Sequence, residues 1–147
     1  MPNAHCVRVE PARSADIPAL IALLAALFEV EKDFCADPAR QRRGIELLLT
    51  QGSERAMVLV ARSQAGEVVG MASGQLVIST AEGAPSAWIE DVVVQSAWRH
   101  RGIGRLLIEA LLAWAQRQGA TRAQLLADTG NTSALAFYRR NKWRPMQ

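Results

Sequence analysis

The chain has 147 residues, of which 50% are apolar and 21% are charged, so it has the size and composition of one soluble globular domain and not those of a disordered chain. Its longest strongly apolar stretch, residues 17–28, is too short for a membrane span of about 20 residues. No secretion signal opens the chain, and its two cysteines match no metal or disulfide spacing. We therefore expect one cytoplasmic domain over residues 5–147 that contacts neither membrane nor metal.

The net charge of +3 is divided unevenly along the chain. Residues 1–98 hold 8 basic and 12 acidic groups, whereas residues 99–147 hold 9 basic and 2 acidic groups. The net charges of the two parts are therefore −4 and +7. Such halves can serve two ligands of opposite sign, although an unevenly charged solvated surface gives the same pattern.

The first third of the chain predicts one short strand and two helices. Apolar and polar residues alternate over Val7–Glu10, as in a strand. A helix follows from residues 14–16, where a serine and an aspartate can cap it, and its apolar residues recur every three or four positions as far as Phe28. A second helix begins after Asp37, which is followed by proline at the first helical position, and it ends at Gly52.

Strand signals dominate the middle of the chain. Residues 57–61 and 68–78 are apolar and β-branched and are separated by a turn, and residues 80–86 are expected to form a loop. Residues 88–94 return as a strand. Regular alternation there places Trp88, Glu90, Val92 and Val94 on one face and Ile89, Asp91 and Val93 on the other.

The last third predicts two helices and two strands. The clearest helix begins at Ile103 and ends at Gly119. A strand over residues 123–127, a helix over 132–140 and a short final strand over 143–146 follow. The resulting order, β-α-α-β-β-β-α-β-α-β, predicts an α/β fold in which helices cover a mixed sheet.

The segment before the clearest helix, residues 99–105, carries the strongest chemical signal. Its sequence is Arg-His-Arg-Gly-Ile-Gly-Arg, so three arginines surround the main-chain amides that open a helix. Such amides favour an anion, and glycines at 102 and 104 let the main chain approach a ligand. The segment is neither a Walker loop nor a complete dinucleotide fingerprint. It predicts a pyrophosphate site, the alternative being a glycine turn on a basic surface.

Two motifs together resemble a known family. Arg99-x-x-Gly102-x-Gly104, after residues 92–94, is similar to the acyl-CoA motif of the GNAT-type N-acetyltransferase superfamily. Asn131-x-x-Ala134-x-x-Phe137-Tyr138 is similar to the second motif of that superfamily, and the element order matches over residues 7–143. The resemblance implies a GNAT-like fold and transfer of acetyl from acetyl-CoA to a primary amine in a ternary complex. The coenzyme contacts that it implies are Val92, Val93, Val94, Arg99, His100, Arg101, Gly102, Ile103, Gly104, Arg105 and Asn131.

Glu90 is the candidate general base. An ammonium group with a pKa near 10.4 must lose its proton before it can attack a thioester. A carboxylate on this strand could remove that proton through a water molecule. Trp88-Ile89-Glu90-Asp91 also resembles a stretch of the polyamine-acetylating branch, in which the glutamate serves as base. The alternative is that Glu90 or Asp91 only binds a cation or pairs with an arginine.

Tyr138, the only tyrosine, is the candidate general acid for the departing thiolate. The alternative is a buried tyrosine whose hydroxyl is satisfied within the protein. A splay in the strand of residues 88–94 would free the amide of Val93 to stabilise the developing oxyanion.

Phe28, Glu29 and Glu31 are the candidate acceptor-binding residues. Aromatic and acidic side chains at the end of the first helix suit a cationic amine of a small molecule or an exposed peptide. Solvent-facing charges at a helix end are the alternative.

Two departures from the family pattern have structural consequences. The family usually has glycine where this chain has Lys142, and we expect Asn141 to adopt the left-handed conformation instead. The chain stops at Gln147, which leaves no room for a final hairpin strand. A homodimer that buries the exposed sheet edge is therefore expected.

Two other functions remain compatible with the sequence. The same fold could serve as a non-catalytic acyl-CoA-binding regulatory module, in which Glu90 and Tyr138 are structural. The +7 half could bind nucleic acid, but the chain has neither a recognition helix nor interleaved surface aromatics, so no nucleic-acid partner is expected.

Overall fold

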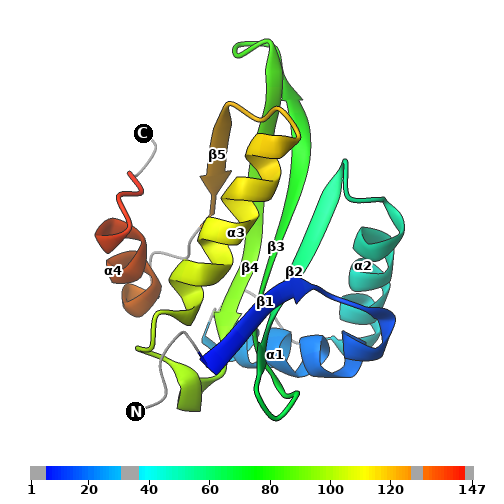
Figure 1. Ribbon diagram of the computed structural model, residues 1–147, viewed down its shortest axis with the longest axis vertical. Coiled ribbons are helices and arrows are strands. Elements are labelled where there is room, and N and C mark those ends of the chain that lie inside the picture. Colours follow the sequence, from blue (N-terminus) through cyan, green and yellow to red (C-terminus); the bar gives the residue numbers. More distant parts are fainter. Residues whose placement is uncertain (1–5, 31–36, 127–130, 145–147) are drawn as a thin grey trace.

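The computed structural model describes residues 6–30, 37–126 and 131–144, and these form a single mixed sheet with helices on both faces (Figure 1). Neighbouring strands pair antiparallel except for β5, which runs parallel to β4. This arrangement confirms the predicted α/β class. In spatial order the strands are β1 (Val7–Pro11), β2 (Ala56–Ser63), β3 (Val68–Ser79), β4 (Ala84–Val94) and β5 (Arg122–Leu125).

The helices enclose two cores on opposite faces of the sheet. α3 (Ile103–Arg117) packs on one face through Leu107, Leu111 and Trp114. α1 (Ile17–Val30) and α2 (Pro38–Thr50) cover part of the other face. α4 (Thr132–Arg140) lies beside α3 at the β5 side of the molecule (Figure 1). In the described ranges, none of these helices combines the length and the apolarity that a membrane span requires.

The predicted cap of the second helix is confirmed. The Asp37 carboxylate accepts a hydrogen bond from the Arg40 amide at 3.2 Å, and Pro38 occupies the first turn. Asn131 caps α4 in the same way, since its side-chain oxygen accepts from the Ala134 amide at 3.2 Å. Short polar side chains therefore set the starts of both helices.

The predicted loop over residues 80–86 is partly wrong, because β4 already begins at Ala84. Residues 84–86 pair with residues 77–79 of β3, and Gly83, with φ of 65°, closes the turn through a 2.9 Å hydrogen bond from its amide to the Ser79 carbonyl. The sequence did not indicate this end of the strand, because its residues, Ala84, Pro85 and Ser86, are small or proline and have low strand propensity.

A β-bulge in β4 overturns the predicted arrangement of its faces. Ser73 pairs with Glu90 but Met71 pairs with Val93, so that one residue of β3 opposes both Asp91 and Val92. Asp91 has φ of 41°, which accommodates the extra residue. The alternation therefore shifts by one position. After the bulge, Val92 and Val94 pack with the core under α3, as Ile89 does before it, whereas Val93 packs with the core under α1.

Glu90 therefore does not share a face with Val92 and Val94, as the regular alternation had predicted. Its neighbour Ile89 packs under α3, so Glu90 points to the opposite side of the sheet.

The end of α4 also differs from the prediction. Lys142 itself has the left-handed conformation, with φ of 69°, while Asn141 has φ of −95°. The Trp143 amide donates to the Tyr138 carbonyl at 3.0 Å, and the Lys142 amide to the Arg139 carbonyl at 3.1 Å. This is a Schellman motif, whose geometry assigns the left-handed position to Lys142.

Of the predicted final strand, only Trp143 and Arg144 lie among the described residues, and neither belongs to a strand. The rest of that segment lies outside them, as does the last residue of the predicted strand 123–127.

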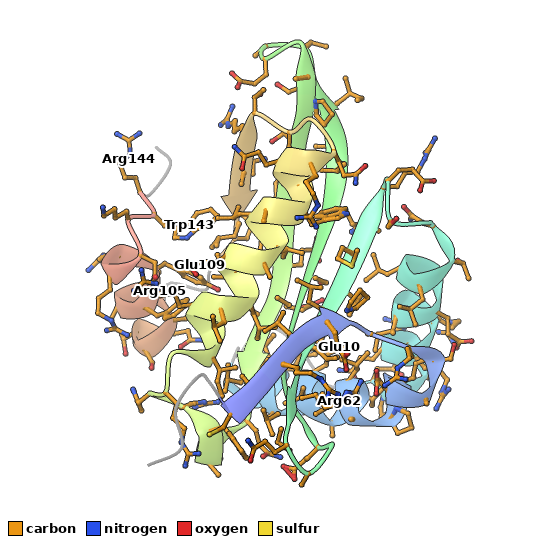
Figure 2. The ribbon with its side chains drawn as sticks, viewed as in Figure 1. Glu10, Arg62, Arg105, Glu109, Trp143 and Arg144 are labelled. Carbon is orange, nitrogen blue, oxygen red and sulfur yellow. The ribbon has the colours of Figure 1, made fainter. Side chains whose placement is uncertain are left out.

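Arg62 connects β2 to β1 and to the start of α1. Its guanidinium donates to both carboxylate oxygens of Asp16, at 3.1 and 2.9 Å. It also donates at 2.6 Å to Glu10, which lies next to Arg62 in Figure 2. The hydrogen bond from Arg62 lowers the pKa of Glu10. Burial raises the pKa of Asp16, but hydrogen bonds from Arg62 and from the Arg13 amide outweigh it, so that the net pKa is lowered.

Replacing Arg62 by alanine is expected to reduce the free energy of unfolding by about 3 kcal/mol at neutral pH, because it leaves the buried Asp16 carboxylate without its countercharge. Both acids have folded-state pKa values below their usual 4.5 and 3.8, so this stabilisation is present above those values and is lost as the pH falls through the folded ones. Urea unfolding should therefore show a smaller difference between variant and wild type at about pH 3 than at about pH 7.

Arg8→Ala is the matched control. Arg8 also approaches Glu10, at 3.6 Å, but its side chain is 72% exposed, and its removal should cost less than about 0.5 kcal/mol. An Arg62→Ala variant no less stable than Arg8→Ala would contradict the prediction.

Candidate active site

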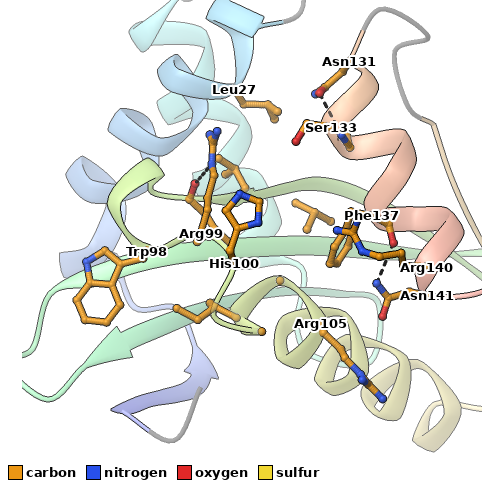
Figure 3. Close-up of a pocket in the computed structure, with 17 residues that line it drawn as sticks. Leu27, Trp98, Arg99, His100, Arg105, Asn131, Ser133, Phe137, Arg140 and Asn141 are labelled. Carbon is orange, nitrogen blue, oxygen red and sulfur yellow. Dashed lines mark hydrogen bonds between the residues drawn. The ribbon is translucent and has the colours of Figure 1, made fainter. Parts of the chain in front are cut away.

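A cavity of about 490 Å³ opens where β4 extends beyond β5. The pairing of these strands ends at Ile89 and Leu125, whereas β4 continues to Val94. In the described part of the chain, no strand replaces β5 there. The cavity is walled instead by Val92–Val94, by the segment that opens α3, and by α4 (Figure 3).

The start of α3 presents main-chain amides to this cavity. Gly102 is the N-cap residue, with φ of 81°, and among the described residues no side chain caps the helix. The first hydrogen bond within the helix runs from the Leu106 amide to the Gly102 carbonyl, at 3.1 Å. The amides of residues 103–105 therefore precede the helical hydrogen bonds and can bind an anion.

Gly104 keeps the cavity open between α3 and α4. A Cβ added at this position would lie 3.2 Å from Cζ of Phe137 and 3.9 Å from a methyl carbon of Val94, both of which line the cavity. Since the first of these distances is tighter than an ordinary contact, any side chain at 104 would fill the space between the two walls.

Arginines surround the mouth of the cavity. Arg99, Arg105 and Arg140 line it, and Arg99 and Arg105 are held by hydrogen bonds from Nε, at 3.1 Å to the Val94 carbonyl and at 2.8 Å to Glu109. Three positive groups around open amides favour a ligand with several negative charges.

Ten of the eleven predicted coenzyme contacts line this one cavity, together with residues that were not predicted to contact the coenzyme. The exception is Arg101, whose guanidinium carbon lies 4.8 Å from the centre of the Trp98 ring. The additional lining residues are Leu27, Trp98, Ser133, Ala134, Phe137, Arg140 and Asn141.

The missed residues on α4 follow helical spacing. Ser133, Phe137 and Arg140 are separated by four and three positions, so they lie on one helix face. Phe137 already belongs to the second motif, so this spacing could have identified Ser133 and Arg140 as residues of the same helix face. Leu27 gave no such signal, because it comes from α1, far away in the sequence.

The two candidate catalytic residues do not line the cavity. Glu90 is exposed on the face of β4 away from α3, and no described residue forms a hydrogen bond or ion pair with its carboxylate. Tyr138 is half-buried, and its ring packs edge-on against Trp143 at a centroid distance of 6.3 Å and against Phe137 at 5.4 Å.

The candidate acceptor-binding residues are described only in part. Phe28 is half-buried near the end of α1, next to Leu27 in the cavity wall. The Glu29 side chain and Glu31 lie outside the described residues.

The chain matches the family model described as "Acetyltransferase (GNAT) family" over residues 19–142. A search of curated proteins finds no match.

Three solved structures are similar over nearly the whole chain. One is a transcriptional regulator from Bacillus halodurans, with 25% identity, a TM-score of 0.83, and coverage of 96% of this chain and 95% of that one. Another is an aminoglycoside acetyltransferase from an uncultured soil metagenomic sample, in complex with sisomicin, with 26% identity, a TM-score of 0.75, and coverage of 97% and 91%. An aminoglycoside N-acetyltransferase in complex with CoA, at 15% identity, shares the fold with a TM-score of 0.80 and coverage of 96% and 90%.

Proposed function

Because the chain belongs to the GNAT acetyltransferase family, we propose that it transfers acetyl from acetyl-CoA to a primary amine by direct attack in a ternary complex. The acceptor is a small molecule or an exposed peptide amine. Similarity to an acetyltransferase that was solved with the aminoglycoside sisomicin supports a small polyamino acceptor.

One observation carries the proposal. The same cavity is lined by the first residues of α3, whose amides form no hydrogen bonds within the helix, by arginines and by apolar side chains. The amides of residues 103–105 and the side chains of Arg99 and Arg105 would hold the pyrophosphate of the coenzyme. Val92–Val94 and Asn131 would hold its pantetheine arm, next to Phe137. When bound, acetyl-CoA supplies the activated acetyl group as a thioester.

Side chains and amides of β4 and α4 would then transfer protons and stabilise the negative charge that develops on the carbonyl oxygen. Glu90 accepts the proton of the attacking amine through water. The Val93 amide, the predicted oxyanion donor, pairs with Met71 in the same register as the hydrogen bond from the Gln95 amide to the Val69 carbonyl, so it faces β3. Its donation to the carbonyl oxygen therefore requires this pairing to open. Tyr138 protonates the departing sulfur. Because its ring does not line the cavity, this last role requires a movement of its side chain.

A turnover screen tests the proposal. The protein is incubated with acetyl-CoA and, in separate reactions, with polyamines, amino acids, aminoglycosides or peptides with free N-termini. The coenzyme thiol that acetyl transfer releases is then measured. Acetylation of at least one amine, together with coenzyme binding by calorimetry, is the expected result. Coenzyme binding without turnover on any amine would contradict catalysis.

A regulatory module that binds the coenzyme without catalysis is the second candidate. It is favoured by the similarity to a transcriptional regulator at 25% identity. Its expected signature in the same screen is coenzyme affinity with no released thiol.

A homodimer through the β5 edge belongs to the same proposal. β5 is a short edge strand, and Leu126, directly after it, is 84% exposed. A second copy could cover this edge, since unpaired strand edges invite pairing. Light scattering at micromolar concentration should give the mass of two chains, and a strictly monomeric mass would refute the dimer.

A further inference from the structure

The two faces of β4 are not equally accessible beside the coenzyme cavity. α3 packs on the face that carries Ile89, in one core with Leu107. The opposite face carries Trp88 and Glu90, because successive residues of a strand point to opposite sides. Val93 also lies on the side of the sheet opposite α3, so an acceptor that reaches the cavity wall at Val93 must approach across the face of Trp88 and Glu90.

The bulge places a second carboxylate on this face. Ser73 pairs with Glu90, and its neighbour Gly74 points toward α3, so Ser73 points away from α3. The Ser73 hydroxyl donates to the Asp91 carboxylate at 3.4 Å, which places that carboxylate on the Ser73 side. In a regular strand Asp91 would point the other way. Glu90 and Asp91 are therefore consecutive carboxylates on one face, where Glu90 is exposed.

Trp88 is the aromatic residue of this face. Its side chain is half-buried, and in the described part of the chain it belongs to neither hydrophobic core. Its cross-strand neighbours, Gln75 on β3 and Gln124 on β5, are both uncharged. The indole therefore lies outside both cores, and neither residue directly opposite it is a cation.

We propose that Trp88 is a specificity-determining residue for the acceptor and selects diamines or polyamines over monoamines. The inference rests on the proposed function. The reacting amine lies at Glu90 and Asp91, and the indole attracts a second ammonium group. Two residues along a strand span about 7 Å, which sets the separation of the two nitrogens. Acceptors with a carboxylate in place of that second ammonium are disfavoured by the two acids.

The test compares putrescine with butylamine, which differ in the second ammonium group. At low ionic strength, the wild type should prefer putrescine in kcat/KM by about tenfold, the size of a partly desolvated cation–π contact. Trp88→Leu should reduce this preference to about twofold or less by raising KM for putrescine. It should leave kcat/KM for butylamine within about twofold, and Trp88→Phe should retain part of the preference.

Trp98→Leu is the matched control, because Trp98 lines the coenzyme cavity on the other side of the strand. It should raise KM for acetyl-CoA and leave the ratio between the two amines unchanged. Equal use of the amines by the wild type, or an unchanged ratio in Trp88→Leu, would overturn the inference.

Calorimetric titration of putrescine into the CoA-loaded protein separates this inference from the proposed function. Putrescine binding that weakens about tenfold in Trp88→Leu supports the inference even where no acetyl transfer occurs, and in that case only the proposed function fails. Absence of putrescine binding to the CoA-loaded wild type overturns the inference, whatever the turnover.

Discussion

A Gly104→Val variant is expected to lose at least about 100-fold in affinity for coenzyme A while it keeps its fold. An added Cβ would already lie 3.2 Å from the Phe137 ring, and the two further methyl groups of valine would extend into the space between α3 and α4. They would also separate the ligand from the amides of residues 103–105, on which the pyrophosphate site depends. Isothermal titration calorimetry with coenzyme A measures the loss.

Gly44→Val is the matched control for this substitution. Gly44 is also a helical glycine, but it is exposed on α2, and a Cβ added there meets nothing within 4 Å. Its coenzyme affinity should equal that of the wild type. Thermal unfolding and circular dichroism establish that both variants are folded. A folded Gly104→Val variant with normal affinity would place the coenzyme outside this cavity.

The Glu90→Gln variant is expected to lose about 100-fold or more in kcat with unchanged affinity for coenzyme A. The amide has nearly the shape of the carboxylate but cannot accept a proton. Since Glu90 is exposed and does not line the cavity, neither the fold nor the coenzyme site depends on it. Released thiol measured at saturating acetyl-CoA gives kcat, and calorimetry gives the affinity.

Two further variants make this result specific. Glu46→Gln changes an exposed carboxylate on α2 and should leave kcat within about twofold, as surface changes usually do. Tyr138→Phe should reduce kcat by about tenfold or more if the hydroxyl protonates the thiolate. If the Glu90→Gln enzyme had the kcat of the wild type, Glu90 would not be the general base, and its role would be limited to binding the acceptor.

Features set by neighbouring residues could be predicted from the sequence. The Asp37-Pro38 helix start depends on a side chain that reaches an amide three residues away, and the anion site before α3 depends on glycines next to a helix. Both are local, so residue types and spacing identify them. The coenzyme roles of residues 92–94 and 99–105 came from the resemblance to the acyl-CoA motif, and apart from Arg101 these residues line the cavity.

Features set by pairing between distant segments could not be predicted. The sequence from Trp88 to Val94 carries no sign of a bulge, because the extra residue arises from the register with β3. Leu27 reaches the cavity from α1 only once the sheet and helices are assembled. Ala84–Ser86 become a strand because residues 77–79 pair with them, in spite of low strand propensity.

The bulge at Asp91 divides β4 into two segments of opposite phase. In the first segment even-numbered side chains point away from α3, and in the second they point toward it. Deleting one residue between the two segments would restore a single phase along the strand. Either the carboxylates would then turn inward under the helix, or the valines would leave the cavity wall. Any grafting of this site onto another scaffold must therefore keep residues 88–94 and their antiparallel partner as one unit.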